Sequence, residues 1–223
     1  MKIVTALSGG LDSTTLLAHL LYKGFEVIPV QFIYGSKHNK YELLAMERIA
    51  YHYKLPPVMT LNLEQAFRTI KSDLLLTGRD IPEGHYNDET MSRTVVPGRN
   101  SIFISFMTGI AESIQAYGVA IGTHLGDHHI YPDCRPEYIL AMNEAMKKAS
   151  DGKVEVMAPF QLLDKGGIVK KGTSLHVPYE ITRTCYKDQP IACGQCGSCR
   201  ERLEAFKANG IPDPIKYESN QWR

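Results

Sequence analysis

The chain has 223 residues, of which 43% are hydrophobic, and its formal net charge is +1 with neutral histidines. This length suits one domain, or one domain with a small appendage, and allows a full apolar core. A nearly neutral chain disfavours an obligate nucleic-acid binder, which usually carries a basic excess to neutralise phosphates. No apolar run has the length of a membrane span, and residues 8–10 interrupt the first apolar segment too early for a secretory signal. We therefore expect a cytoplasmic protein that acts on small molecules, with no membrane and no direct nucleic-acid partner.

Apolar runs and helical periodicity alternate in the first part of the chain. Residues 3–7, 27–33 and 58–63 read as strands, whereas residues 13–22 and 40–53 carry apolar side chains at helical spacing. Strands that alternate with helices at this spacing predict a parallel sheet with right-handed crossovers. The predicted fold class is therefore α/β: an open, mostly parallel twisted sheet with helices on both faces, Rossmann-like, followed by a small zinc-binding region.

The pattern weakens in the middle of the chain. Residues 64–98 are polar and interrupted by glycine and proline, which predicts a long loop near the site that acts as a lid. A helix over residues 100–117 and a strand over 119–121 follow, and residues 136–149 and 165–175 are predicted to be helical. A cysteine-rich tail ends the chain.

Residues 8–13 read SGGLDS and lie between the first predicted strand and the first predicted helix. Glycines let the backbone approach an anion, and a helix amino end offers unpaired N–H groups. The loop lacks the lysine with which a Walker loop reaches the β- and γ-phosphates. A cradle without it suits holding pyrophosphate while the α-phosphate is attacked. The alternative is a plain Gly-Gly turn in which Asp12 and Ser13 form a helix N-cap.

Five cysteines are present, and four of them lie close together at residues 185, 193, 196 and 199. In a cytosolic chain this clustering favours one structural zinc ion bound by Cys185, Cys193, Cys196 and Cys199. Disulfides, an iron–sulfur cluster and redox-active thiols are the alternatives. Cys134 stands apart, and it is either a small buried residue or a nucleophile.

The SGGLDS loop resembles the pyrophosphate loop (PP-loop) of the adenylating ATP pyrophosphatases. Four further stretches sharpen this resemblance: VPGRN at 96–100, YPDCRPEYI at 131–139, TCY with the cysteine array, and ERLEAFKANGIPDPIKY at 201–217. Together they resemble the 7-cyano-7-deazaguanine synthase family of queuosine biosynthesis over nearly the whole chain. Residues 122–130 depart from the family's usual G-x-N-x-x-D-x-S-G pattern, and Arg183-Thr184-Cys185 stands where W-S-C is usual.

The resemblance implies a PP-loop ATP-binding α/β domain over residues 1–180 and a four-cysteine zinc-binding region over 181–223, packed on the same domain. It implies a ligase that converts 7-carboxy-7-deazaguanine and ammonia to the nitrile through adenylated acid and amide intermediates, releasing AMP and pyrophosphate. Mg²⁺ would accompany ATP, and the family suggests a homodimer. Three alternatives stay open: a variant that stops at the amide, a PP-loop tRNA-modifying enzyme, and a non-catalytic nucleotide-binding zinc module.

The resemblance also assigns residues. It implies that ATP is bound by the loop and the start of the first helix: Leu7, Ser8, Gly9, Gly10, Leu11, Asp12, Ser13, Thr14, Thr15, Leu16 and Leu17. The implied catalytic residues are Asp12, Ser13, Arg99 and Asp127. The implied substrate-binding residues are Arg99, Asn100, Tyr131, Asp133 and Arg135.

The expected roles follow from the chemistry of each side chain. Arg99 offsets charge on the reacting phosphorus, or forms a surface ion pair. Asn100 caps the next helix or contacts the base. Asp127 and Asp133 accept from the N–H edge of a guanine-like base or bind magnesium.

Tyr131 is expected to stack on the base, and Arg135 to pair with the substrate carboxylate. Three histidines, His124, His128 and His129, lie nearby in sequence. They are solvated loop residues, or one of them is a base.

Overall fold

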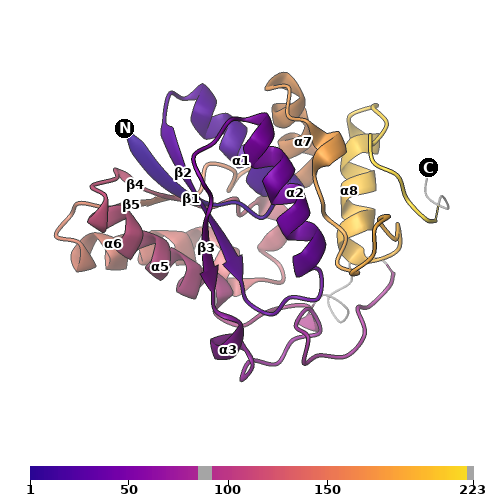
Figure 1. The fold of residues 1–223 in the computed structure, drawn as a ribbon, viewed down its shortest axis with the longest axis horizontal. Coiled ribbons are helices and arrows are strands. Elements are labelled where there is room, and N and C mark those ends of the chain that lie inside the picture. Colours follow the sequence, from indigo (N-terminus) through magenta and orange to yellow (C-terminus); the bar gives the residue numbers. More distant parts are fainter. Residues whose placement is uncertain (85–91, 220–223) are drawn as a thin grey trace.

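The computed structural model describes residues 1–84 and 92–219. Its centre is a parallel sheet with the strand order β3-β2-β1-β4-β5 (Figure 1). The strands are β1 (Lys2–Ala6), β2 (Glu26–Ile33), β3 (Met59–Asn62), β4 (Gly118–Ala120) and β5 (Glu155–Met157). Because β1 lies between β2 and β4, the segment that follows β1 leaves the sheet at its centre.

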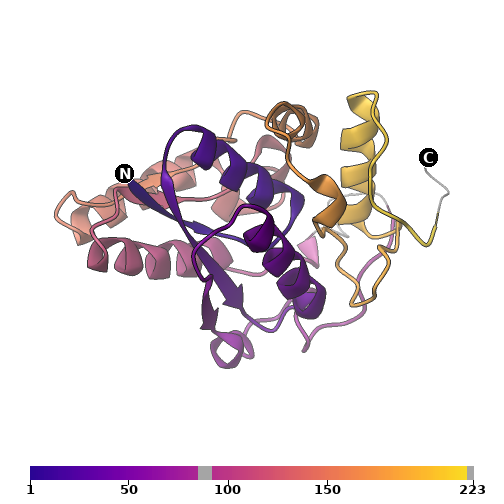
Figure 2. The ribbon, with the colours of Figure 1, turned by 45° about the horizontal axis from the view of Figure 1, so that its top comes forward.

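Helices cover both faces of the sheet, as Figures 1 and 2 show from two directions. The longer helices are α1 (Leu11–Tyr22), α2 (Asn39–His52), α5 (Arg99–Ser113), α6 (Pro136–Ala149), α7 (Lys165–Ser174) and α8 (Gly197–Ala208). Shorter helical turns are α3 (Glu64–Phe67), η1 (Leu125–Asp127), η2 (Pro132–Cys134) and η3 (Tyr179–Ile181). The predicted α/β class, with a parallel sheet and helices on both faces, is confirmed.

Alternation along the strands creates two apolar cores. Ile3 packs on one face with side chains of α1, α2 and α7, whereas Val4 packs on the other face with side chains of α5 and α6. Neighbouring residues of a strand point to opposite faces, so a strand covered on both faces reads as a continuous apolar run. This is why the sequence of β1 shows no polar alternation.

The C-terminal helix shares the first of these cores. Ala205 and Phe206 of α8 are buried in the same cluster as Leu17 of α1 and Ile168 of α7. The predicted boundary at residue 180 therefore separates two segments of the described chain that have a common core. Within the described residues, no helix is long and apolar enough to cross a membrane.

Besides the short helical turns α3, η1, η2 and η3, two elements are absent from the sequence prediction. Strand β5 has three residues, which is too few to establish a period of two. Helix α8 has the sequence GSCRERLEAFKA, whose cysteines and charges we interpreted as a tail. The predicted lid over 64–98 contains the short helix α3, and its residues 85–91 lie outside the described residues.

A contact between the PP-loop and α2 yields a prediction about stability. Gly9 has φ +75°, and a Cβ there would lie 2.4 Å from the backbone nitrogen of Met46. Gly24 has a similar φ of +81° with nothing within 4 Å, so it is a matched control. Both alanine variants place a Cβ on a left-handed backbone conformation, which costs free energy in each. Only in Gly9→Ala does the Cβ also collide with α2, so that α2 must move. We expect Gly9→Ala to lose roughly 2 kcal/mol more unfolding free energy than Gly24→Ala in urea titrations.

Equal losses in the two variants would contradict this prediction. They would show that α2 moves away from the loop at no measurable cost.

Candidate active site and metal centre

The PP-loop leaves the sheet at the point where the strand order reverses. Strands β2 and β3 lie on one side of β1, and β4 and β5 lie on the other. Ligands of open parallel sheets bind at such a switch point, beyond the carboxyl ends of the strands. A cleft of about 270 Å³ opens there, and we call it the PP-loop cleft. Its lining includes Leu7, Ser8, Gly10, Leu11, Asp12 and Ser13 of the loop and the start of α1.

The loop holds itself together while leaving the amino end of α1 uncapped. The hydroxyls of Ser8 and Ser13 lie 3.0 Å apart, and the backbone N–H of Gly10 donates to Ser8 Oγ over 3.3 Å. The N-cap residue of α1 is Gly10, and no side chain caps the helix. Asp12 and Ser13 are therefore within the helix, and the alternative in which they form its N-cap is wrong. Uncapped N–H groups at a helix start suit an anion.

The remaining predicted ATP residues lie deeper. Leu16 and Leu17 belong to the apolar core, and Thr14 is fully buried. The hydroxyl of Thr15 donates to the carbonyl of Leu11 over 2.8 Å and lies 2.9 Å from the hydroxyl of Tyr179. These four residues do not line the PP-loop cleft. They fix α1 in place.

A lysine that the sequence analysis missed lies against the PP-loop. Lys165, the first residue of α7, places its Nζ 2.7 Å from Asp12 Oδ2 and 3.2 Å from Glu201 Oε2. Its side chain is only 10% exposed. The loop has no lysine of its own, so α7 brings an ammonium group to it from a distant part of the chain. The start of a helix at residue 165 was predicted, but no spacing in the sequence indicates that this helix lies beside residue 12.

Charges in this cluster stabilise one another. Burial pushes the pKa of Asp12 upward, but Lys165 and then His124 outweigh burial and hold that pKa below its usual value. Burial opposes the charge of Lys165, yet Asp12 and Glu201 raise its pKa above the usual range. Asp12 and Lys165 are therefore an ion pair at neutral pH. The other oxygen of Asp12, Oδ1, is buried and has no hydrogen-bond partner in the described part of the chain.

Asp127 lines the cleft, and His124 lies buried beside it. His124 Nδ1 accepts from the backbone N–H of Gly126 over 3.1 Å, so Nε2 carries the proton, and it lies 3.4 Å from Asp127 Oδ2. Burial raises the pKa of Asp127 to about 7. Burial, with help from Lys165, lowers the pKa of His124 to about 3. His124 is thus neutral, and its Nε2 has no hydrogen-bond partner within the described residues, although its backbone N–H donates to Asp127 Oδ2 over 3.3 Å. Asp127 is the group that changes charge near neutral pH.

Arg99 and Asn100 open α5 on the other side of the cleft. Arg99 Nη1 donates to Tyr34 Oη over 3.4 Å, and Arg99 lines the cleft rather than forming a surface ion pair. The N-cap of α5 is Gly98, with φ +70°, so the expectation that Asn100 caps the helix is wrong. The backbone N–H of Asn100 instead donates to Asp133 Oδ2 over 3.1 Å, and its side chain donates to Cys134 Sγ over 3.2 Å.

The predicted substrate residues divide into two groups. Tyr131 joins Arg99 and Asn100 in the lining of the cleft, whereas Asp133 and Arg135 do not line it. Asp133 Oδ2 accepts a hydrogen bond from the backbone N–H of Asn100 in the first turn of α5. Arg135 Nε donates to the carbonyl of His128 over 2.9 Å. Their predicted contacts with substrate remain predictions.

Cys134 also lines the cleft and is 4% exposed. Burial raises the pKa of its thiol well above the usual value, which keeps the thiol protonated. A protonated thiol is a poor nucleophile. Of the two interpretations of Cys134, the structure favours the small buried residue.

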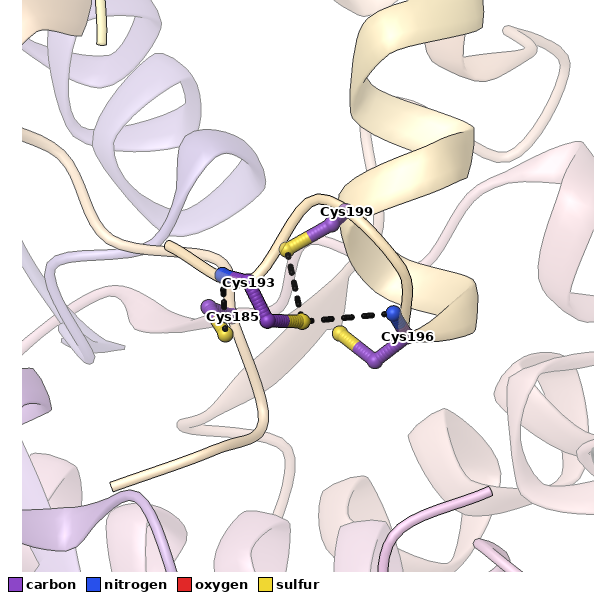
Figure 3. Close-up of side chains that lie close together, drawn as sticks. All are labelled: Cys185, Cys193, Cys196 and Cys199. Atoms are coloured by element: carbon purple, nitrogen blue, oxygen red, sulfur yellow. Dashed lines mark hydrogen bonds between the residues drawn. The ribbon is translucent and has the colours of Figure 1, made fainter. Parts of the chain in front are cut away.

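The four clustered cysteines meet in space. Their sulfur atoms all lie within 4.8 Å of one another, and all four residues are buried. Figure 3 shows the sulfurs gathered where the preceding loop meets the amino end of α8, with Cys199 in the first turn of that helix. Cys193 Sγ and Cys199 Sγ are 3.9 Å apart. None of the four forms a disulfide, so that alternative is not realised.

Backbone amides surround these sulfurs. The N–H groups of Lys187 and Cys193 donate to Cys185 Sγ, and those of Gln195 and Cys196 donate to Cys193 Sγ, over 3.3–3.4 Å. Such donors stabilise thiolates and orient them. A tetrahedron with metal–sulfur bonds of about 2.3 Å has sulfur atoms roughly 3.8 Å apart, which is close to the 3.9 Å between Cys193 Sγ and Cys199 Sγ. The cluster could therefore hold a metal ion.

Sheet order, loop position and cysteine cluster define an α/β protein of the PP-loop type with four clustered cysteines that could hold a metal ion. Solved structures agree on the fold. NMN synthetase from Francisella tularensis superposes with a TM-score of 0.52 at 13% identity, covering 94% of this chain and 77% of that one. A 4-thiouridine synthetase, solved with RNA and ATP, gives a TM-score of 0.51 at 20% identity, covering 97% of this chain and 47% of that one.

Sequence comparison gives the family. The family model described as "Queuosine biosynthesis protein QueC" matches residues 2–210. The 7-cyano-7-deazaguanine synthase 2 of Colwellia psychrerythraea is 44% identical over 217 residues, 97% of this chain and 98% of that protein. The corresponding synthase of Methanoregula boonei is 43% identical over 98% of this chain and all of that protein. The chain belongs to the QueC family, so the predictions of this family and of an enzyme are confirmed.

The elevated pKa of Asp127 predicts how stability depends on pH. Asp127 has a pKa of about 7 in the folded chain and an ordinary value of 3.8, so folding favours its protonated form. Its contribution to stability is complete below the ordinary value and is lost as pH rises through about 7. We expect the unfolding free energy of Asp127→Asn to rise relative to that of the parent protein as pH increases from about 4 to about 7, and to stay higher above pH 7, in denaturant titrations.

Asp151→Asn is the matched control, because Asp151 is exposed and its φ of 50° is tolerated by asparagine. The unfolding free energy of this control should follow the same pH dependence as that of the parent protein. A parallel curve for Asp127→Asn as well would contradict the assignment.

Proposed function

We propose that this enzyme converts 7-carboxy-7-deazaguanine, ammonia and ATP to 7-cyano-7-deazaguanine. One observation carries the proposal: cationic side chains from two helices, Lys165 and Arg99, reach a PP-loop cleft whose helix end is uncapped. Cations and free N–H groups on both sides of one cleft suit a triphosphate and a carboxylate that must meet. The named activity of the relatives supports the choice of substrate.

The reaction divides into two activations. A carboxylate oxygen attacks the α-phosphorus of ATP, pyrophosphate leaves, and ammonia then displaces AMP from the carbonyl carbon to give the amide. The amide oxygen attacks a second ATP, pyrophosphate leaves again, and loss of AMP with the remaining N–H protons forms the nitrile. Each step needs a good leaving group and a proton acceptor, and neither step needs a covalent link to the enzyme.

The residues of the cleft suit these needs. The loop amides beside Ser8 and Ser13 would hold the departing pyrophosphate. Arg99 would offset charge at the reacting phosphorus. Asp127, with a pKa of about 7, would accept protons from the attacking nitrogen.

An aromatic wall offers a place for the planar base. Phe32 and Phe103 stack with ring centroids 3.9 Å apart, and Tyr34 meets Phe103 edge to face at 5.5 Å. These three rings line the PP-loop cleft beside Arg99. Aromatic faces bind flat heterocycles by stacking. The deazaguanine ring would lie against this wall with its carboxylate toward Arg99.

Mg²⁺ and zinc have separate places in this proposal. The partnerless Oδ1 of Asp12 is a suitable oxygen ligand for the Mg²⁺ that accompanies ATP, which would reduce phosphate charge. Cys185, Cys193, Cys196 and Cys199 would hold one zinc ion in a closed structural site. A closed site leaves no position for water, so the zinc would stabilise the fold rather than react.

The tRNA-thiolating alternative needs a reactive sulfur. All five cysteines are buried, and the thiol of Cys134 is held protonated. Sulfur transfer requires an accessible thiolate. The cysteines thus favour the ligase over a thiolase.

Product analysis tests the reaction. The protein is incubated with 7-carboxy-7-deazaguanine, ammonium and Mg-ATP, and the products are identified by mass spectrometry. We expect the nitrile, which is lighter than the amide by one water. Accumulated amide alone would show a variant that stops early, and ATP binding without pyrophosphate release would contradict catalysis.

Metal analysis tests the cysteine site. We expect one zinc per chain in the purified protein and a loss of zinc in Cys196→Ser. Loss of the metal should also lower the unfolding temperature, because metal binding to the folded chain contributes its free energy to folding. Cys134→Ser is the matched control and should keep its zinc, since Cys134 lies outside the cluster. Iron in place of zinc would favour the iron–sulfur alternative.

A further inference from the structure

The carboxylate of Glu201 has no part in the reaction described above, yet it contacts Lys165, the lysine that α7 places against the PP-loop. Glu201 Oε2 lies 3.2 Å from Lys165 Nζ, and the two side chains are 24% and 10% exposed. Its other oxygen faces the segment that carries His124 and Asp127, since a Cβ on Gly126 would lie 3.2 Å from Oε1. Glu201 therefore lies between two walls of the PP-loop cleft, which it helps to line.

Helix α8 holds Glu201 firmly in this position. Cys196 is the N-cap of α8 and Cys199 lies in its first turn, so the cysteine cluster fixes the amino end of the helix. On the buried side, Arg202 donates to both carboxylate oxygens of Asp213 over 2.8 and 2.9 Å and to Thr182 Oγ1 over 2.7 Å. Glu201 is adjacent to this anchored arginine, and its backbone cannot shift without breaking these bonds.

Lys165 is thus shared between two carboxylates that differ in their other contacts. Asp12 lies on the loop helix and has a buried oxygen free for a cation, whereas Glu201 lies on α8. One ammonium group divides its attraction between the two acids. Without Glu201, the whole attraction would fall on Asp12, and a cation beside Asp12 would then compete with the full charge of Lys165.

We propose that Glu201 is a positioning residue: it draws Lys165 partly away from Asp12 and so keeps Asp12 available to Mg²⁺ when the nucleotide binds. This inference rests on the proposed function, in which Mg-ATP occupies the cleft. It assigns to α8, the helix that begins in the cysteine cluster, a part in binding the nucleotide.

Substitution of Glu201 by glutamine removes the charge and keeps the shape. The measurement is calorimetric binding of Mg²⁺ with a non-hydrolysable ATP analogue to the whole protein, over a series of Mg²⁺ concentrations. We expect Glu201→Gln to raise the Mg²⁺ concentration for half-maximal binding about fivefold. In turnover assays the same variant should change the half-saturating Mg-ATP concentration more than kcat. Glu201→Asp restores the charge and should recover part of the loss.

Glu204→Gln is the matched control, because Glu204 lies on the same helix, carries the same charge and is exposed outside the cleft. It should leave the Mg²⁺ dependence unchanged. A Glu201→Gln protein with normal zinc content and a Mg²⁺ requirement within about twofold of the parent protein would overturn the proposal. The binding measurement needs no turnover, so it decides on Glu201 even if the substrate assay fails.

Discussion

The ammonium group of Lys165 connects three helices that line the cleft through ionic contacts. It is nearly buried, and it contacts Asp12 of α1 and Glu201 of α8 while belonging to α7 itself. A buried charge is tolerated only where opposite charges replace the lost water. With two acids around one base, the cluster carries an excess of negative charge when both are ionised. That excess of negative charge would favour the Mg²⁺ that accompanies ATP in the proposed reaction.

A second buried cation, Arg202, connects the C-terminal region to the helix that follows the PP-loop. Arg202 is 1% exposed and forms a bidentate pair with Asp213, and it also donates to the carbonyl of Tyr179. Tyr179 in turn contacts Thr15 of α1 through its hydroxyl. The rigid guanidinium plane fixes direction as well as distance. The chain of contacts therefore leads from the C-terminal region back to the helix that starts at the PP-loop.

Local sequence determined the features that could be predicted. The runs at residues 3–7 and 27–33 are apolar because both faces of the sheet are covered, and the SGGLDS loop has its glycine where α2 approaches too closely for a side chain. Lys165 was missed because its meeting with Asp12 depends on how α7 packs across the fold. His124 is likewise buried, which its neighbours in the sequence do not indicate. Residue spacing predicts which side chains lie close together within one helix or strand. It says little about which side chains of two different elements meet.

The cysteine cluster illustrates how a structural centre can influence a reaction without contacting the reactants. Its sulfurs bind no group in the cleft, yet the cluster decides where α8 begins, and Ser198 and Glu201 follow within its first turns. Helical geometry places residues three apart on one face, so both side chains line the cleft once the first turn is fixed. A metal that holds four sulfurs in a tetrahedron fixes that turn in the folded state. The proposed nucleotide and the proposed metal would therefore favour the same arrangement of α8, and each would stabilise binding of the other through this helix.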